Sequence, residues 1–396
     1  MRLNPYPRLS ALALAAVAAL VLAGCGDAEV ATDEPAEGAP EATSDDAAGE
    51  VEAVEGGTDD GEADDGETVA APVEPALSLV ATVAPVADLV EQVGGERVEV
   101  EPLVPAGGDA HTYEPRPQDV VMLAEADAYI GIGLGLNDGA LRLAEENLPE
   151  GSPLFLLGEA ALTDEDLVFD HTHDHGDDGH THDNGHTHGD DGHTHGDDGH
   201  THGDDGHTHG QDGPGPNPHV WTSVRNAAAL VEAIAEALSE LDPDGADTYA
   251  ANAEAYQEEL AELDLAIRDA TVTIPATNRT LVTYHDAWTY FARDYDLDYA
   301  TAVQPADFSE PSASEVRAVI DLIRELDVPV VFGSEVFPTP VLEAIAEETG
   351  ATYVADLSDD VLPGEPGSPE HSYLELMRRN AHAIVDALGG DASELG

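Results

Sequence analysis

The chain has 396 residues and a formal net charge of −70, with 83 acidic side chains against 13 basic ones, all of them arginine. So negative a surface excludes nucleic acid as a partner and suits a partner that is a cation. The single cysteine, Cys25, excludes an intramolecular disulfide.

Residues 1–25 are typical of a secretory signal peptide. Arg2 and Arg8 accompany an apolar run over 9–22 that is too short to predict a membrane-spanning helix. The run ends Leu-Ala-Gly-Cys, which resembles the bacterial lipobox, so we expect Cys25 to carry the lipid anchor. Anchoring by acyl chains predicts a protein on the extracytoplasmic face of the cell membrane or in the periplasm.

Residues 26–76 contain 18 acidic residues and no basic ones, among many Ala, Gly and Thr. Such a segment buries too little apolar surface to fold, and its like charges repel one another. We therefore expect a disordered acidic tether between the anchor and the folded part of the chain.

Residues 77–245 alternate short apolar runs with helical patterns, which predicts an N-terminal α/β lobe with a parallel sheet. The expected strands are Ser78–Val83, Arg97–Pro102, Ala128–Ile132 and Pro153–Leu157, and the helical patterns include Val86–Val93 and Pro117–Ala124.

A histidine-rich insert over 171–212 interrupts this lobe and repeats the unit Gly-Asp-Asp-Gly-His-Thr-His. Neutral imidazole is the commonest side-chain ligand of zinc and similar metals, and the Gly, Asp and Thr spacers have nothing to bury. The pattern predicts an auxiliary metal loop, with a solvated loop of no function as the alternative. Its thirteen histidines are His171, His173, His175, His180, His182, His186, His188, His193, His195, His200, His202, His207 and His209.

Residues 246–270 are rich in Ala, Glu and Leu and lack Gly and Pro, which predicts one long helix of roughly 37 Å. Residues 271–396 then repeat the alternation of strands and helices and form a C-terminal α/β lobe. Its expected strands are Leu281–Tyr284, Tyr299–Val303, Val328–Phe332 and Thr352–Ala355, and its expected helices are Glu315–Leu326, Pro340–Thr349 and Tyr373–Leu388. The predicted fold is two parallel-sheet α/β lobes joined by one rigid helix, with the ligand in the inter-lobe cleft.

Five histidines lie outside the insert. His111, His219 and His285 fall at predicted strand ends or in tight loops, where sites form in α/β lobes. His371 and His382 belong to the last helix or its start, and we expect them to have surface or packing roles.

Five motifs together resemble the metal-binding receptors of ABC importers, the cluster A-I solute-binding proteins, over roughly residues 77–390. The motifs are Gly-Asp-Ala-His-Thr-Tyr-Glu-Pro-Arg-Pro (108–117), Asn-Pro-His-Val-Trp (217–221), Tyr-His-Asp-Ala-Trp-Xaa-Tyr-Phe (284–291), Phe-Ser-Glu-Pro-Ser-Ala (308–313) and Tyr-Leu-Glu-Leu-Met-Arg-Arg-Asn (373–380). The resemblance implies that His111, His219, His285 and Asp356 bind the metal. Glu335 or a water molecule is the alternative fourth ligand, because the residue after Asp356 is not the proline usual in the family.

Three imidazoles and one carboxylate form a four-coordinate set that suits zinc, whereas manganese prefers more oxygen ligands. A histidine-rich loop before the second ligand is also a mark of the family's zinc members. The resemblance therefore implies a monomeric, lipid-anchored receptor that captures Zn(II) as its transported ligand. Delivery would be to a separate permease and ATPase, because the chain contains no Walker A loop and no second long apolar run.

The sequence leaves open three alternatives to a zinc receptor. A manganese or iron receptor of the same family is the first, and a surface metal buffer or adhesin is the second. A zinc enzyme is the third, since three protein ligands and a water also form catalytic sites. The chain lacks a His-Glu-x-x-His motif and an evident general base, so we expect no enzyme activity.

Overall fold

The computed structural model describes residues 75–105, 108, 110–169, 215–304, 311–334 and 340–395. The expected signal peptide with Cys25, residues 26–74 of the expected acidic tether, the thirteen histidines of the insert and Glu335 lie outside these residues. Within them, no helix combines the length and the apolarity needed to cross a bilayer. The described residues belong to one compact unit, Val69–Gly396.

The N-terminal lobe is built on a four-stranded parallel sheet with the order β2-β1-β3-β4. Its strands are β1 (Leu77–Ala81), β2 (Val98–Pro102), β3 (Ala128–Gly131) and β4 (Leu154–Leu156). Helices α1 (Ala84–Gly94), α2 (Pro117–Glu125), α3 (Asp138–Asn147), α4 (Leu157–Ala161) and α5 (Val224–Leu241) follow in chain order. Sheets covered by helices on their faces need apolar side chains on both sides, which explains why every residue of β3, and every residue of β1 except Ser78, is buried.

The C-terminal lobe contains a second parallel sheet with the equivalent order β6-β5-β7-β8. Its strands are β5 (Thr280–His285), β6 (Asp298–Gln304), β7 (Val330–Ser334) and β8 (Thr352–Leu357). Its helices are α7 (Thr289–Asp294), α8 (Ala313–Leu326), α9 (Pro340–Thr349) and α10 (Tyr373–Ala387). The prediction of two parallel α/β lobes is confirmed.

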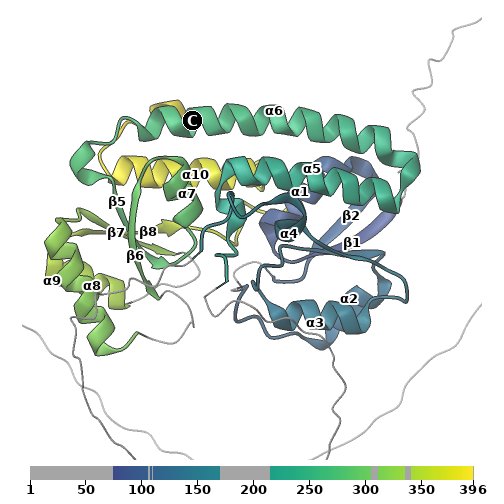
Figure 1. Cartoon of the computed structure of the whole chain (residues 1–396), viewed down its shortest axis with the longest axis horizontal. Helices are drawn as coiled ribbons and strands as arrows, with labels where there is room; N and C mark the ends of the chain where they lie inside the picture. The colour runs from purple at the N-terminus through teal and green to yellow at the C-terminus, as the bar shows by residue number, and fades with distance from the viewer. Residues whose placement is uncertain are drawn as a thin grey trace, which may run out of the picture. The chain divides into compact units, whose positions relative to one another are not determined.

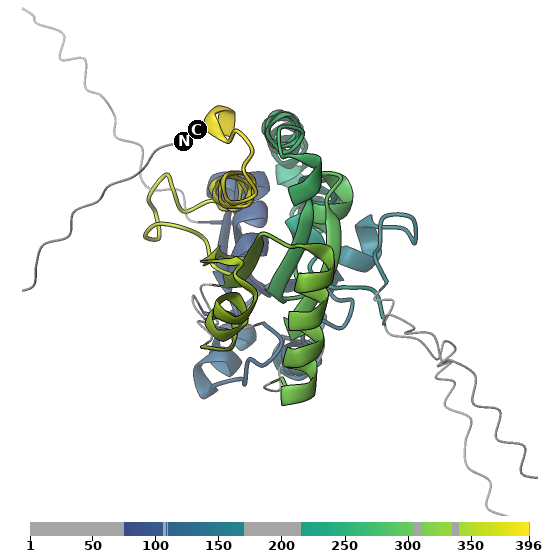
Figure 2. The same cartoon turned by 90° about the vertical axis from the view of Figure 1, so that its left-hand side faces the viewer.

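Helix α6 (Ala246–Thr271) connects the two sheets, where the sequence predicts one long helix. It packs along α5 and α10, and Figure 1 shows it lying above both of them. Its buried side chains, such as Leu260 and Ile267, belong to a hydrophobic cluster that also contains residues from both lobes. Figure 2 shows the same arrangement end-on, with α10 beside α6. A shared core of this kind opposes large hinge motions between the lobes.

Buried polar contacts add to this shared core. The carboxylate of Asp88 in α1 accepts a hydrogen bond from the backbone N–H of Tyr373, the first residue of α10, at 2.8 Å. Arg97 pairs with Asp242 at 2.5 Å just before α6, and Tyr249 in α6 donates to the same carboxylate at 2.7 Å. The first contact joins the start of α10 to α1, and the others join the start of α6 to the N-terminal lobe.

Candidate metal centre

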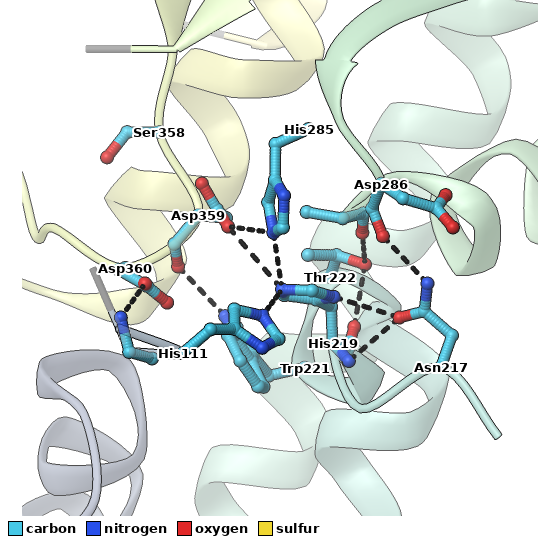
Figure 3. Close-up of polar contacts among 12 residues, drawn as sticks. His111, Asn217, His219, Trp221, Thr222, His285, Asp286, Ser358, Asp359 and Asp360 are labelled. Carbon is cyan, nitrogen blue, oxygen red and sulfur yellow. Dashed lines mark hydrogen bonds and ion pairs between the residues drawn. The ribbon is translucent and has the colours of Figure 1, made fainter. Parts of the chain in front are cut away.

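Three histidines from separate segments meet between the two sheets (Figure 3). His111 lies in the loop between β2 and α2, His219 directly precedes the short 3-10 helix η2 (Val220–Thr222), and His285 is the last residue of β5. Among the described residues, they are the one group of three or more His, Cys, Asp or Glu whose candidate ligand atoms all lie within 4.8 Å of one another.

The ring nitrogens of these histidines converge on His219. Its Nε2 lies 2.9 Å from Nε2 of His111 and 2.8 Å from Nε2 of His285. His219 and His285 are buried, and His111 is partly exposed. Burial, followed by the charges of His285 and His111, lowers the pKa of His219 well below its ordinary value. His219 is therefore neutral at physiological pH, which is the form that binds metal ions.

Asn217 determines which nitrogen of His219 is available. Its amide Nδ2 donates to the backbone carbonyl of Asp286 at 2.7 Å, so its Oδ1 faces His219. That oxygen lies 2.9 Å from Nδ1 and accepts the backbone N–H of His219 at 3.0 Å. Since an amide oxygen can only accept, Nδ1 carries the proton and Nε2 presents its lone pair to the cluster.

A buried carboxylate lies beside two of these histidines, and it belongs to Asp359. Its Oδ2 lies 3.9 Å from Nε2 of His219 and 3.8 Å from Nε2 of His285, and its side chain is buried. Figure 3 shows Asp359 beside the two histidine rings, in the loop that follows β8. The N-terminal lobe thus supplies two imidazoles, and the C-terminal lobe supplies one imidazole and one carboxylate.

The structure does not place Asp356 with the three histidines, where the sequence led us to expect it. Asp356 is exposed and lines a surface groove with Arg379 and His382 of α10. The sequence ends the last strand at Ala355, whereas β8 continues through Leu357, so residue 356 is still part of the strand. The chain turns toward the histidines only at 358–360, and the paired Asp359-Asp360 was the available signal.

The other histidines lie elsewhere. His371 is partly buried, with its Nδ1 3.2 Å from the carbonyl of Pro363, and His382 is exposed on α10. The insert itself lies outside the described residues, but its two ends meet. Phe169 and Pro216 form an antiparallel bridge, and the N–H of Asn217 donates to the carbonyl of Val168 at 2.8 Å. The residues that flank the insert on either side therefore lie together, and Pro216 is three residues before His219.

Comparison with known proteins agrees with this geometry. The family model described as "Zinc-uptake complex component A periplasmic" matches residues 79–387. The high-affinity zinc uptake system protein ZnuA of Paracoccus denitrificans is 39% identical over 325 residues, which are 82% of this chain and 96% of that protein. The manganese-binding lipoprotein MntA of Halalkalibacterium halodurans is 29% identical over 79% of this chain and 88% of that protein.

Solved structures show the same fold. The periplasmic zinc-binding protein TroA of Treponema pallidum superposes with a TM-score of 0.63, with 24% identity over 79% of this chain and 99% of that chain. The relatives are metal-binding receptors and not enzymes, so the resemblance in the five motifs is confirmed at the level of the family. The chain belongs to the family of the periplasmic component A of zinc-uptake complexes.

Proposed function

We propose that the chain is a Zn(II) receptor that binds one ion between its lobes through His111, His219, His285 and Asp359. The carrying observation is the convergence of three imidazole Nε2 atoms beside a buried carboxylate oxygen. Zinc takes such nitrogen and oxygen donors at about 2.0–2.1 Å in a tetrahedral arrangement. Manganese favours oxygen-rich sites of higher coordination, which this donor set does not offer.

The distances support Asp359 as the fourth ligand. Two ligand atoms that each lie about 2.0–2.1 Å from a tetrahedral ion are roughly 3.3 Å apart. The Asp359 oxygen is 3.8–3.9 Å from the Nε2 atoms of His219 and His285, and Nε2 of His219 is 2.8–2.9 Å from those of His111 and His285. On metal binding, the rings would therefore separate by a few tenths of an ångström and the carboxylate would approach by a similar amount.

The proposed cycle is capture outside the cytoplasm followed by delivery to a membrane permease driven by a separate ATPase. Relatives named as manganese ABC transporter substrate-binding lipoproteins support this partnership. Lipidation at Cys25 would hold the receptor at the membrane, and the acidic tether would let a monomeric folded part reach the permease. The histidine-rich insert would raise the local metal concentration, because its ends meet next to Asn217 and His219.

A manganese or iron receptor is the competing function. Its specific support is that MntA and the iron-binding protein YfeA of Yersinia pestis are 29% and 28% identical to this chain over most of its length. Against it stands His285, because a carboxylate at that position would provide the extra oxygen that manganese prefers.

A competitive titration of Zn²⁺ against Mn²⁺ separates these functions. The chain would be tested from residue 77 onward, with and without residues 171–212, since residues 169 and 216 already lie side by side. We expect one tight zinc site that persists without the insert, that excess manganese does not displace, and several weak sites that disappear with the insert. Preference for manganese, or loss of the tight site with the insert, would contradict the proposal.

A further inference from the structure

Trp221 connects the histidine side of the site to the loop that holds Asp359. It lies in η2, two residues after His219, and its side chain is fully buried. Its indole Nε1–H donates to the backbone carbonyl of Asp359 at 2.8 Å, and its ring lies 5.4 Å from the ring of His219 (Figure 3). One side chain of the N-terminal lobe thus contacts both a histidine and the peptide that carries the carboxylate.

The backbone of Trp221 is in turn held by a hydrogen bond from Tyr373. The hydroxyl of Tyr373 donates to the Trp221 carbonyl at 2.7 Å, and the backbone N–H of Tyr373 is bound by the buried Asp88. A continuous series of buried hydrogen bonds therefore runs from α1 through the start of α10 and η2 to Asp359. Every member is buried, so none of these bonds competes with bulk water.

The loop over 358–360 has two further anchors. Asn380 of α10 binds both backbone groups of Ser358, at 2.9 and 2.6 Å. The carboxylate of Asp360 accepts the backbone N–H of Ala110 at 3.2 Å, directly beside His111. Hydrogen bonds thus hold Ser358 and Asp360 on either side of Asp359, and the indole of Trp221 binds the carbonyl of Asp359 itself.

We propose that Trp221 is a positioning residue that fixes the Asp359 carboxylate in its approach to the metal, and that it thereby favours zinc over manganese. This inference rests on the proposed metal site. A buried indole N–H needs some acceptor in any case, so the bond alone could serve packing. The choice of acceptor carries the inference, because it is the carbonyl of the residue whose Oδ2 faces two histidines.

The preference for zinc over manganese follows from the orientation of the Asp359 carboxylate. With its peptide held, the carboxylate presents Oδ2 to the histidines and completes a set of three nitrogens and one oxygen. If the peptide could rotate, the carboxylate could bind through both oxygens or let water enter the coordination sphere. Either change adds oxygen ligands, which costs zinc affinity and favours manganese.

Replacement Trp221→Phe in the chain without residues 171–212 tests the role, because it keeps a buried ring and removes the N–H. We expect about a 10-fold loss of zinc affinity, the low end of the range found when groups that orient a ligand are removed and less than the loss on removing Asp359 itself. Manganese affinity should fall less, so the zinc-to-manganese ratio decreases. Bound Co²⁺ should lose part of the strong visible absorption of four-coordinate cobalt, because added oxygen ligands raise its coordination number above four.

Trp288→Phe is the matched control, since Trp288 is also buried near the site but packs edge-on against Phe291. Tyr373→Phe is a second, milder variant in case Trp221→Phe does not fold, and it should change the ratio and the cobalt spectrum in the same direction. If both variants keep the affinity, ratio and cobalt spectrum of the Trp288 control, Trp221 is packing only. Absence of tight zinc binding in the parent chain would instead contradict the proposed function itself.

Discussion

The two lobes have the same sheet order, yet they supply the candidate site in different ways. The N-terminal lobe contributes His111 and His219 from segments outside its strands, and His219 is oriented by Asn217. The C-terminal lobe contributes His285 from the end of β5 and Asp359 from the loop after β8. Neither lobe holds more than two of the four proposed donors, so we expect tight binding to require a fixed position of one lobe against the other, which the shared core around α6 favours.

The largest expected effect comes from removing the histidine on which the others converge. His219→Ala should weaken zinc binding by about 100-fold or more, because about 10–16 kcal/mol of zinc binding divided among four ligands leaves roughly 3 kcal/mol for each. His285→Ala, from the other lobe, should have an effect of the same order. Competition with a zinc chelator measures both, with His382→Ala on the exposed face of α10 as the control.

Two aspartates of the C-terminal lobe, Asp356 and Asp359, provide the next test. Asp359→Ala should reduce zinc affinity on the order of 30-fold, less than loss of a histidine, because water can occupy a fourth position on zinc. Asp356→Ala should leave the affinity unchanged, since that side chain is exposed in the groove beside α10. Loss of zinc affinity in Asp356→Ala, with none in Asp359→Ala, would contradict the assignment of Asp359 as the fourth ligand.

On the N-terminal side, Asn217→Ala should reduce zinc affinity by about 10-fold, because His219 loses the acceptor that fixes its tautomer. Asn252→Ala is the matched control. Asn252 lies in α6, and its side chain donates to the carbonyl of Val93 in the N-terminal lobe at 2.9 Å. Both variants should lose some stability against denaturant. Equal metal affinity in the two would mean that Asn217 is only structural.

The smallest expected effect concerns the metal-free protein. Burial lowers the pKa of His219 in the folded state, while in the unfolded chain it stays near 6.5. Below pH 6.5 the unfolded chain binds a proton that the folded chain does not, so this group destabilises the fold as the pH falls, by up to about 1.4 kcal/mol per pH unit. Above pH 6.5 the contribution is constant.

Denaturant unfolding of metal-free protein between pH 7.5 and 5.5 measures this contribution. The original chain should lose more stability toward acid than the His219→Gln variant, whose side chain does not titrate. The difference between the two slopes isolates His219 from the many carboxylates, which titrate in both proteins. Parallel slopes would show that His219 takes up a proton as readily in the fold as out of it.

Much of the fold could be predicted because its signals are local. The composition of α6 and the apolar runs of the strands placed these elements within a few residues, and the end of β5 placed His285. Helix α5 was not identified separately, although Leu230, Ile234 and Leu238 recur at its buried positions four residues apart. Periodicity therefore predicted the architecture, the end of β5 predicted the place of His285, and the sequence motifs indicated His111 and His219 as candidate donors.

The fourth donor could not be predicted from the same signals. Choosing between Asp356 and Asp359 requires the end of β8, and strand ends depend on pairing with β7, where the register shifts between Phe332 and Ser334. The bond from Trp221 to Asp359 joins residues 138 positions apart, so no local pattern indicates it. Contacts between the lobes join residues far apart in the sequence, so they are seen only in the folded chain.

The most direct test of the central claim is X-ray absorption at the zinc edge, on the chain without residues 171–212 loaded with one equivalent of zinc. The account predicts three imidazole nitrogens and one carboxylate oxygen at about 2.0–2.1 Å, with one imidazole lost in His219→Ala and the spectrum unchanged in Asp356→Ala. A first shell dominated by five or six oxygens, or one that is unchanged in His219→Ala, would contradict it.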